Sequence, residues 1–269
     1  MSGLSPRDLR LVALRAASEA AGLLRDFECT REYARVVRGE TIRADIESEN
    51  YIIDMLRREI GGRLAVVSEE RGVDGKPEDL VALVDPLDGS KNYVACIPWA
   101  SVSIAFAVNS GGVWRLEAGA VAPIFRGGSP ISFERGGGCF MGGTRVERPL
   151  LENPSILAVY VDSSQAASLV ARLLEALKGR FKTRSLGSSA LEISYSAVGL
   201  FAGFVDLRAR LRNVDVAAAV GAMRECGGEV LGEAGEPLEI EVDRVARLGA
   251  VVASRLHEIL EASRPLLRG

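Results

Sequence analysis

The chain has 269 residues and a nearly balanced charge, with 33 lysines and arginines against 36 acidic residues. A net charge of −3 without a basic run argues against nucleic acid as a partner. No stretch approaches roughly 18 uninterrupted apolar residues and the N-terminus has no signal-peptide core, so we expect no membrane association and a cytoplasmic location. This length permits one large core or two fused cores.

The first half of the chain predicts two helices and a meandering sheet. Ser5-Pro6 begins the first helix, and a second is expected from about residue 47 to residue 59. Residues 36–43 between them are interpreted as a mobile connection or a hairpin. Strands are predicted at 63–68, 80–85, 101–108 and 114–122, with a further hairpin bracketed by the glycines at 127–128 and 136–138.

From about Ser155 the pattern changes to an alternation of strands and helices. Strands are predicted at 156–161, 181–186, 201–207 and 250–253, and helices at 164–178, from Ser189 and after Asp215. This alternation is typical of a more parallel α/β sheet. We therefore predict an α/β protein of two parts, residues 1–152 with a mixed or antiparallel sheet and residues 153–269 with a more parallel one.

The cysteines and the histidine carry no recognisable chemistry. Cys29, Cys96, Cys139 and Cys226 have no paired spacing, and we interpret them as small buried hydrophobic residues rather than as disulfides or a zinc site. The single histidine, His257, stands in a predicted C-terminal helix and is expected to be structural or exposed. An imidazole base or a histidine-ligated zinc ion is therefore not expected.

The run DPLDGS at residues 85–90 follows an apolar stretch and is the most informative feature of the chain. Gly89 permits close backbone approach, and Ser90 is a good residue to begin a helix, whose first N–H groups attract a phosphate. Two acids beside such a site would repel the phosphate and each other unless divalent cations lie between them. The run predicts a metal-bridged phosphate site, with an ordinary acidic turn as the alternative.

Two further acidic motifs support the metal interpretation. Glu69 and Glu70 follow an apolar strand, and Asp215 stands where an alanine-rich helix begins. Read alone, the first pair would be solvated charges and Asp215 a helix N-cap. Together with Asp85 and Asp88, however, these carboxylates supply enough hard oxygen ligands for two Mg²⁺ or Mn²⁺ ions. Two such ions clamp the attacking and leaving oxygens of an in-line phosphoryl displacement.

The three motifs, in this order and spacing, resemble the inositol monophosphatase superfamily, and in particular its archaeal-type branch of fructose-1,6-bisphosphatase and inositol monophosphatase enzymes. DPLDGSKNY at 85–93 matches the family block DPLDG(S/T)xN(F/Y), and VDVAAAVGAMRECGG at 214–228 matches the (W/V)DxAA block with its following Gly-Gly. The resemblance covers nearly the whole chain. It implies the αβαβα layered sandwich of the sugar-phosphatase fold and a homodimer or homotetramer.

The resemblance also implies the metal ligands. Glu69, Asp85 and the carbonyl of Leu87 would bind one ion. Asp85, Asp88 and Asp215 would bind a second. The implied cofactor is Mg²⁺, as two or three ions, with Mn²⁺ as an alternative.

In the same family an upstream Asp and the hydroxyl after "DG" position the attacking water, which makes Asp45 and Ser90 catalytic here together with Glu69. Asp45 follows Arg43-Ala44, a departure from the usual Thr-x-x-Asp spelling, and its alternative interpretation is an N-cap for the helix at 47–59. Glu70 is assigned no ligand role and is expected to support the site through its neighbours.

Substrate contacts are implied by the segment RSLGSS at 184–189, which resembles the sugar-ring contact segment of the family. The residues predicted to bind substrate are Gly89, Ser90, Tyr160, Arg184, Gly187, Ser188 and Arg208. Arg208 stands seven residues before Asp215, where inositol-specific members carry a Glu. A guanidinium suits a second phosphate better than a neutral polyol. The alternative is an arginine cluster paired with neighbouring acids.

These observations predict a Mg²⁺-dependent phosphomonoesterase. It would hydrolyse the 1-phosphate of fructose 1,6-bisphosphate, and inositol 1-phosphate as well, by direct attack of water. A phosphatase acting on 3′-phosphoadenosine 5′-phosphate or NADP is the alternative enzyme. A degenerate, sugar-phosphate-binding regulator is the non-enzyme alternative, and the complete set of metal carboxylates argues against it.

Overall fold

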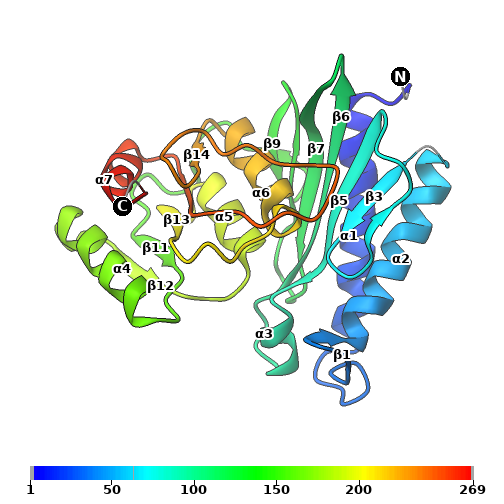
Figure 1. Ribbon diagram of the computed structural model, residues 1–269, viewed down its shortest axis with the longest axis horizontal. Coiled ribbons are helices and arrows are strands. Elements are labelled where there is room, and N and C mark those ends of the chain that lie inside the picture. Colours follow the sequence, from blue (N-terminus) through cyan, green and yellow to red (C-terminus); the bar gives the residue numbers. More distant parts are fainter. Residues whose placement is uncertain (1–2, 63, 268–269) are drawn as a thin grey trace.

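Alternating layers of helices and sheets make up the computed structural model, which describes residues 3–62 and 64–267. From right to left, Figure 1 shows an outer layer of helices, a large sheet, an inner layer of helices, a small sheet and a second outer layer of helices. This is the αβαβα sandwich that the sequence predicted. The helices are α1 (Pro6–Asp26), α2 (Arg43–Ile60), α3 (Ser90–Val94), α4 (Ser164–Ala176), α5 (Ser189–Ala197), α6 (Asn213–Glu225) and α7 (His257–Leu267).

The first two helices begin at identifiable capping residues. The hydroxyl of Ser5 accepts a hydrogen bond from the backbone of Asp8, whose carboxylate accepts one from the backbone of Ser5, and this capping box begins α1. Helix α2 begins at Arg43, four residues earlier than predicted, because the Asp45 carboxylate accepts a hydrogen bond from the Ile42 backbone N–H at 2.7 Å. The segment between the helices contains the hairpin of β1 (Val36–Arg38) and β2 (Thr41–Ile42).

The large sheet has the order β10-β9-β8-β7-β6-β5-β3-β4, in which only β3 and β5 pair in parallel. From β5 to β10 it is an antiparallel meander. Strand β5 continues beyond its predicted end at Asp85 to Asp88, through an irregularity between these two residues, so one strand carries both acids of the run. The strands are β3 (Ala65–Ser68), β4 (Gly72–Asp74), β5 (Leu80–Asp88), β6 (Ser101–Ser110), β7 (Val113–Pro123), β8 (Ile131–Glu134), β9 (Gly138–Met141) and β10 (Thr144–Arg145).

The small sheet has the order β12-β11-β13-β15-β14, with two parallel and two antiparallel pairings. It is therefore the more parallel of the two sheets, as predicted. All strands of the large sheet precede residue 146 and all strands of the small sheet follow residue 155, while a domain boundary at 152/153 stays a prediction. The strands are β11 (Ile156–Val159), β12 (Lys182–Arg184), β13 (Gly203–Asp206), β14 (Glu229–Leu231) and β15 (Val251–Ser254).

Helix α6 joins the two sheets into one hydrophobic core. It packs against β5 to β9 of the large sheet and against β14 and β15 of the small one. Gly221 allows the closest contact, because a Cβ there would lie only 2.1 Å from the Phe133 ring. The tight packing fixes the start of α6, where Asp215 stands, beside the end of β5, where Asp85 stands.

The interpretation of the cysteines as unpaired was wrong. Cys29 is bonded to Cys96, and Cys139 to Cys226, each with 5.3 Å between the Cα atoms. The partners stand 67 and 87 residues apart, so the tertiary fold creates pairs that local spacing does not reveal. His257, the first residue of α7, has an 81% exposed side chain, in line with the sequence prediction. Within the described ranges, no helix is both long and apolar enough to cross a membrane.

Candidate active site

Three carboxylates from three elements meet at one edge of the large sheet. Glu69 directly follows β3, Asp85 lies in β5, and Asp215 lies in the first turn of α6. The parallel pairing of β3 with β5 aligns Ser68 with Val84, which places the following residues at the same edge. One carboxylate oxygen of each acid lies within 4.8 Å of one oxygen of the other two.

The electrostatics of this cluster favour a bound divalent cation. Burial raises the pKa of Asp85, and the charges of Glu69, Asp88 and Asp215 raise it further. Burial likewise raises the pKa of Glu69 and of Asp215. In addition, Oδ1 of Asp215 is buried and has no hydrogen-bond partner within the described residues. Oxygen ligands grouped in this way fit Mg²⁺ or Mn²⁺.

The predicted carbonyl ligand, Leu87, lies beside the cluster. Its backbone N–H donates to Oδ1 of Asp85 at 3.1 Å, which fixes the orientation of that carboxylate. The carbonyl of Pro86 accepts a hydrogen bond from the Ser48 hydroxyl at 2.7 Å. Of these two backbone residues, Leu87 is the one that lines the adjacent cavity.

Asp88 lies outside the group of three carboxylates. Its Oδ2 accepts hydrogen bonds from the Ser188 hydroxyl at 2.6 Å and from the Ala190 backbone at 2.8 Å. Burial raises the pKa of Asp88 to about 7, although these two hydrogen bonds oppose the shift. Asp88 therefore links the metal-binding run to the start of α5, and it also lines the cavity.

The loops on the two sides of the cavity approach closely through glycines. Gly89 has φ +90°, and a Cβ there would lie 3.0 Å from the Trp99 carbonyl oxygen and 3.1 Å from that of Gly187. Gly187 has φ +93°, a conformation that favours glycine. Both line the cavity together with Ser90, the first residue of α3. The backbone at these predicted substrate contacts is therefore accessible.

Asp45 lies at the start of α2 and at the cavity, and its catalytic role stays a prediction. Its Oδ2 caps the start of α2, as described above, and its side chain also lines a cavity beside Glu69 and Glu70. Burial raises the pKa of Asp45 to about 7, and the charges of Glu70 and Glu69 add to this shift. A carboxylate with a pKa near neutrality is well suited to accept a proton in general base catalysis.

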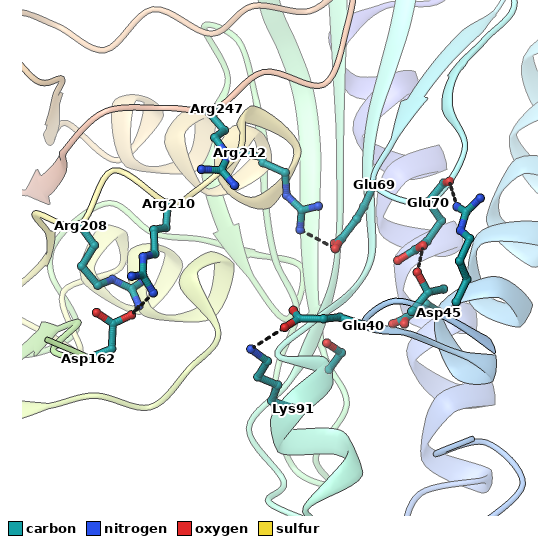
Figure 2. A pocket seen from close by; sticks show the side chains of 13 residues that line it. Glu40, Asp45, Glu69, Glu70, Lys91, Asp162, Arg208, Arg210, Arg212 and Arg247 are labelled. Carbon is teal, nitrogen blue, oxygen red and sulfur yellow. Dashed lines mark hydrogen bonds and ion pairs between the residues drawn. The ribbon is translucent and has the colours of Figure 1, made fainter. Parts of the chain in front are cut away.

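Two cavities of about 690 Å³ and 420 Å³ share much of their lining at this site. Figure 2 shows Asp45, Glu69 and Glu70 on one side of the larger cavity and Arg208, Arg210, Arg212, Arg247 and Asp162 on the other. Arg208 and Arg210 both point at Asp162, and Arg212 points at Glu69. The arginines that line the larger cavity are Arg38, Arg208, Arg210, Arg212 and Arg247.

Arg208 is more fully paired than the sequence analysis expected. Its guanidinium donates to both oxygens of Asp206 at 2.8 and 3.0 Å and to Asp162 at 2.9 Å. It also lies over the Tyr160 ring, 4.3 Å from the centroid. Arg208 and Tyr160 both line the smaller cavity, but most donors of this guanidinium already have acidic partners. A second phosphate would have to compete with these carboxylates.

Two predicted substrate contacts do not reach the cavity wall. Arg184 is exposed at the end of β12 and donates to the Thr183 carbonyl at 2.7 Å. Ser188 is fully buried, and its hydroxyl donates a hydrogen bond to Asp88. Strand β12 lies at the edge of the small sheet, and Gly187 lines the smaller cavity whereas Arg184, the last residue of β12, does not.

Two residues of the site were missed. Arg212 pairs with Glu69 and lies 3.3 Å from Oδ1 of Asp215. Its position three residues before Asp215 at a helix start was the available signal. Glu192 is fully buried in α5, and its Oε1 accepts a hydrogen bond from the backbone of Leu186 in the substrate segment at 2.9 Å. The only sign of it was that Glu192 is the one charged residue of this helix.

Buried carboxylates that could hold a metal ion lie at the edge of a sheet in an αβαβα sandwich, beside an arginine-lined cavity that suits small anionic molecules. The inositol monophosphatase family model matches residues 6–265, and the chain belongs to this family. It is therefore a phosphoric monoester hydrolase of a metal-dependent family that acts on small phosphorylated substrates.

Similar proteins agree with this assignment. The chain is 54% identical over 256 residues to an inositol-1-monophosphatase of Aeropyrum pernix, covering 93% of this chain and 94% of the relative. It is 31% identical to a fructose-1,6-bisphosphatase of Pyrococcus furiosus, covering 85% and 84% of the two chains. Among solved structures, a hypothetical Pyrococcus horikoshii protein with similarities to inositol-1 monophosphatase superposes with a TM-score of 0.80 at 27% identity, covering 98% of each chain.

Proposed function

We propose that this protein is a Mg²⁺-dependent phosphatase that hydrolyses inositol 1-phosphate by direct attack of water. The relative at 54% identity carries the name inositol-1-monophosphatase, whereas the relative named fructose-1,6-bisphosphatase is 31% identical. The proposal therefore prefers inositol 1-phosphate, whereas the sequence analysis preferred fructose 1,6-bisphosphate. Fructose 1,6-bisphosphate becomes the second candidate substrate.

The observation that carries the proposal is the position of Asp162. The family resemblance implies a Glu in inositol-specific members where this chain has Arg208. Here the Arg208 guanidinium binds Asp162 and so places a carboxylate at the same wall. Asp162 is held by Arg210 as well and is 32% exposed. An ionised carboxylate accepts hydrogen bonds from hydroxyl groups. Asp162 therefore supplies the acceptor for inositol hydroxyl groups that is missing at position 208 of the sequence.

The residues of the site account for the reaction. Glu69, Asp85 and Asp215 would hold the metal, with Leu87 and Asp88 beside them, and the metal would supply positive charge at the phosphate.

Asp45 accepts the proton of the attacking water, which the Ser90 hydroxyl orients. Both residues line the larger cavity. Gly187 lets the ring approach the backbone, and Asp162 binds a ring hydroxyl. These roles are proposals.

Specific observations support the second substrate and weigh against the nucleotide alternative. Arg210 and Arg247 line the cavity and are exposed, so they could bind a second phosphate of fructose 1,6-bisphosphate. A nucleotide would need an open aromatic face for its base. Tyr160 is the one aromatic residue among the described lining of the two cavities, and Arg208 covers its ring.

The test is a turnover assay with Mg²⁺ and four substrates: inositol 1-phosphate, fructose 1,6-bisphosphate, NADP and 3′-phosphoadenosine 5′-phosphate. We expect the highest kcat/KM for inositol 1-phosphate. Replacing Asp162 with Asn should raise KM for inositol 1-phosphate about tenfold, since one charged hydrogen bond is weakened. Asp243→Asn, at an exposed position outside the cavity lining, serves as the control and should leave KM unchanged.

A higher kcat/KM for fructose 1,6-bisphosphate would restore the original preference. Binding of these substrates without turnover, in Mg²⁺ or in Mn²⁺, would instead support the non-enzyme alternative, a regulator that binds sugar phosphates. A homodimer or homotetramer, which the family resemblance supports, is tested by light scattering. The cytoplasmic location stays a prediction.

A further inference from the structure

Arg212 has two contacts with the carboxylate cluster and one additional contact through its backbone. Its guanidinium is paired with Oε1 of Glu69 and lies 3.3 Å from Oδ1 of Asp215. Its backbone N–H donates to the other oxygen of Asp215 at 2.8 Å. A single residue at the start of α6 thus contacts two of the three carboxylates that would bind the metal. Figure 2 shows its contact with Glu69.

The cluster needs a positive charge whether or not a metal is present. Two like charges at about 4 Å repel by about 4 kcal/mol at the effective dielectric constant of a protein surface. Within the described residues, Arg212 is the only cationic side chain paired with Glu69 or Asp215, and none is paired with Asp85. The guanidinium therefore balances part of the charge that a divalent cation would balance.

The Arg212 guanidinium borders open space into which it can move away from the carboxylates. Its side chain is 33% exposed and lines both cavities. Because the Asp215 carboxylate accepts a hydrogen bond from the Arg212 backbone N–H and not only from its side chain, α6 keeps its start when the side chain moves. A guanidinium and a divalent cation that share two carboxylates repel each other, so occupation of the cluster by one disfavours the other.

We infer that Arg212 is an internal counter-cation that competes with the metal for Glu69 and Asp215 and that metal binding displaces it into the cavity. The inference rests on the proposed function, because it assumes that this cluster is the metal site. The displaced guanidinium remains on the wall of the substrate cavity, where it can bind an anionic oxygen of the substrate. Arg212 therefore sets the metal affinity and stabilises the metal-free protein.

The experiment measures Mg²⁺ binding to the metal-free full-length protein by calorimetry at low ionic strength. Arg212→Met removes the charge and keeps an unbranched side chain, and Arg212→Gln is a second variant in case the first folds poorly. Both should bind Mg²⁺ about tenfold more tightly than wild type, within the usual range of coupling between two sites. Both should melt at a lower temperature without metal, by a margin that shrinks in saturating Mg²⁺.

The matched control is Arg210→Met. Arg210 lines the same cavity and pairs with Asp162 but does not touch the cluster, so its loss should leave Mg²⁺ affinity within about twofold of wild type. Equal or weaker Mg²⁺ binding by the folded Arg212 variants would overturn the inference while leaving the proposed function intact. Absence of Mg²⁺ and Mn²⁺ binding by the wild type would instead overturn the proposed function itself.

Discussion

Glu192 allows a quantitative test of how burial controls charge in this fold. It is fully buried, and this burial raises its pKa from 4.5 to about 8, with Asp88 adding to the shift while Tyr160, the Leu186 backbone and Arg208 oppose it. Between about pH 4.5 and about pH 8, the folded protein keeps the proton on Glu192, whereas the unfolded chain has released it. This group therefore contributes stability that is fully present below about pH 4.5 and is lost as the pH rises through about 8.

The perturbation is Glu192→Gln, which cannot ionise but keeps an oxygen for the Leu186 backbone N–H. One proton of difference is worth about 1.4 kcal/mol per pH unit, so the wild type should lose about 3 kcal/mol from this group between about pH 5.5 and about pH 8. The variant has no such loss. The free energy of unfolding of the variant, relative to wild type, should therefore rise by about 3 kcal/mol over that interval.

The assay is urea unfolding of the metal-free proteins at the two pH values. The other carboxylates with raised pKa values titrate in both proteins, so their contributions cancel in the difference. Glu175→Gln, at an exposed position in α4, is the control. A difference between variant and wild type that changes by less than about 0.5 kcal/mol would refute the reasoning, since it would mean that Glu192 keeps its charge when buried.

Three further predictions concern the metal cluster, the proposed base and a disulfide. Asp85→Asn should stay folded but lose Mg²⁺ affinity and at least about nine-tenths of kcat, and a variant that retains more would not support a metal ligand at this position. Asp45→Asn should lower kcat far more than it changes KM. Normal turnover with a lower melting temperature would show that Asp45 only caps α2. Cys29→Ser should lower the free energy of unfolding by about 2–4 kcal/mol under non-reducing conditions, and this difference from wild type should disappear when both proteins are reduced.

The parts of the site that lie at the ends of regular elements were predictable. Glu69, Asp85 and Asp215 each stand at or near the end of an apolar strand or at the start of an alanine-rich helix. The pairing of strands and the packing of that helix decide where such ends lie. The structure accordingly brings the three carboxylates together, and the layered fold agrees with the prediction.

The parts that depend on partners distant in sequence were not predictable. Arg208 is occupied by Asp162, 46 residues away, and the cysteines pair across 67 and 87 residues. The Ser188 hydroxyl donates to Asp88 across 100 residues, a contact that the sequence did not reveal. No local sequence pattern reveals contacts of this kind. The entropic cost of closing a long loop changes only slowly with its length, so it does not favour one distant partner over another.

The position of α6 between the sheets has a consequence for folding during synthesis on the ribosome. The last strand of the large sheet ends at Arg145, but the helix that covers its inner face ends only at Glu225, 80 residues later. At roughly 5–20 residues per second, about 4–16 s pass between the synthesis of the sheet and the completion of its cover. During this interval the apolar side of the nascent sheet, including the Phe133 ring that later packs on Gly221, is open to chaperones and to neighbouring chains.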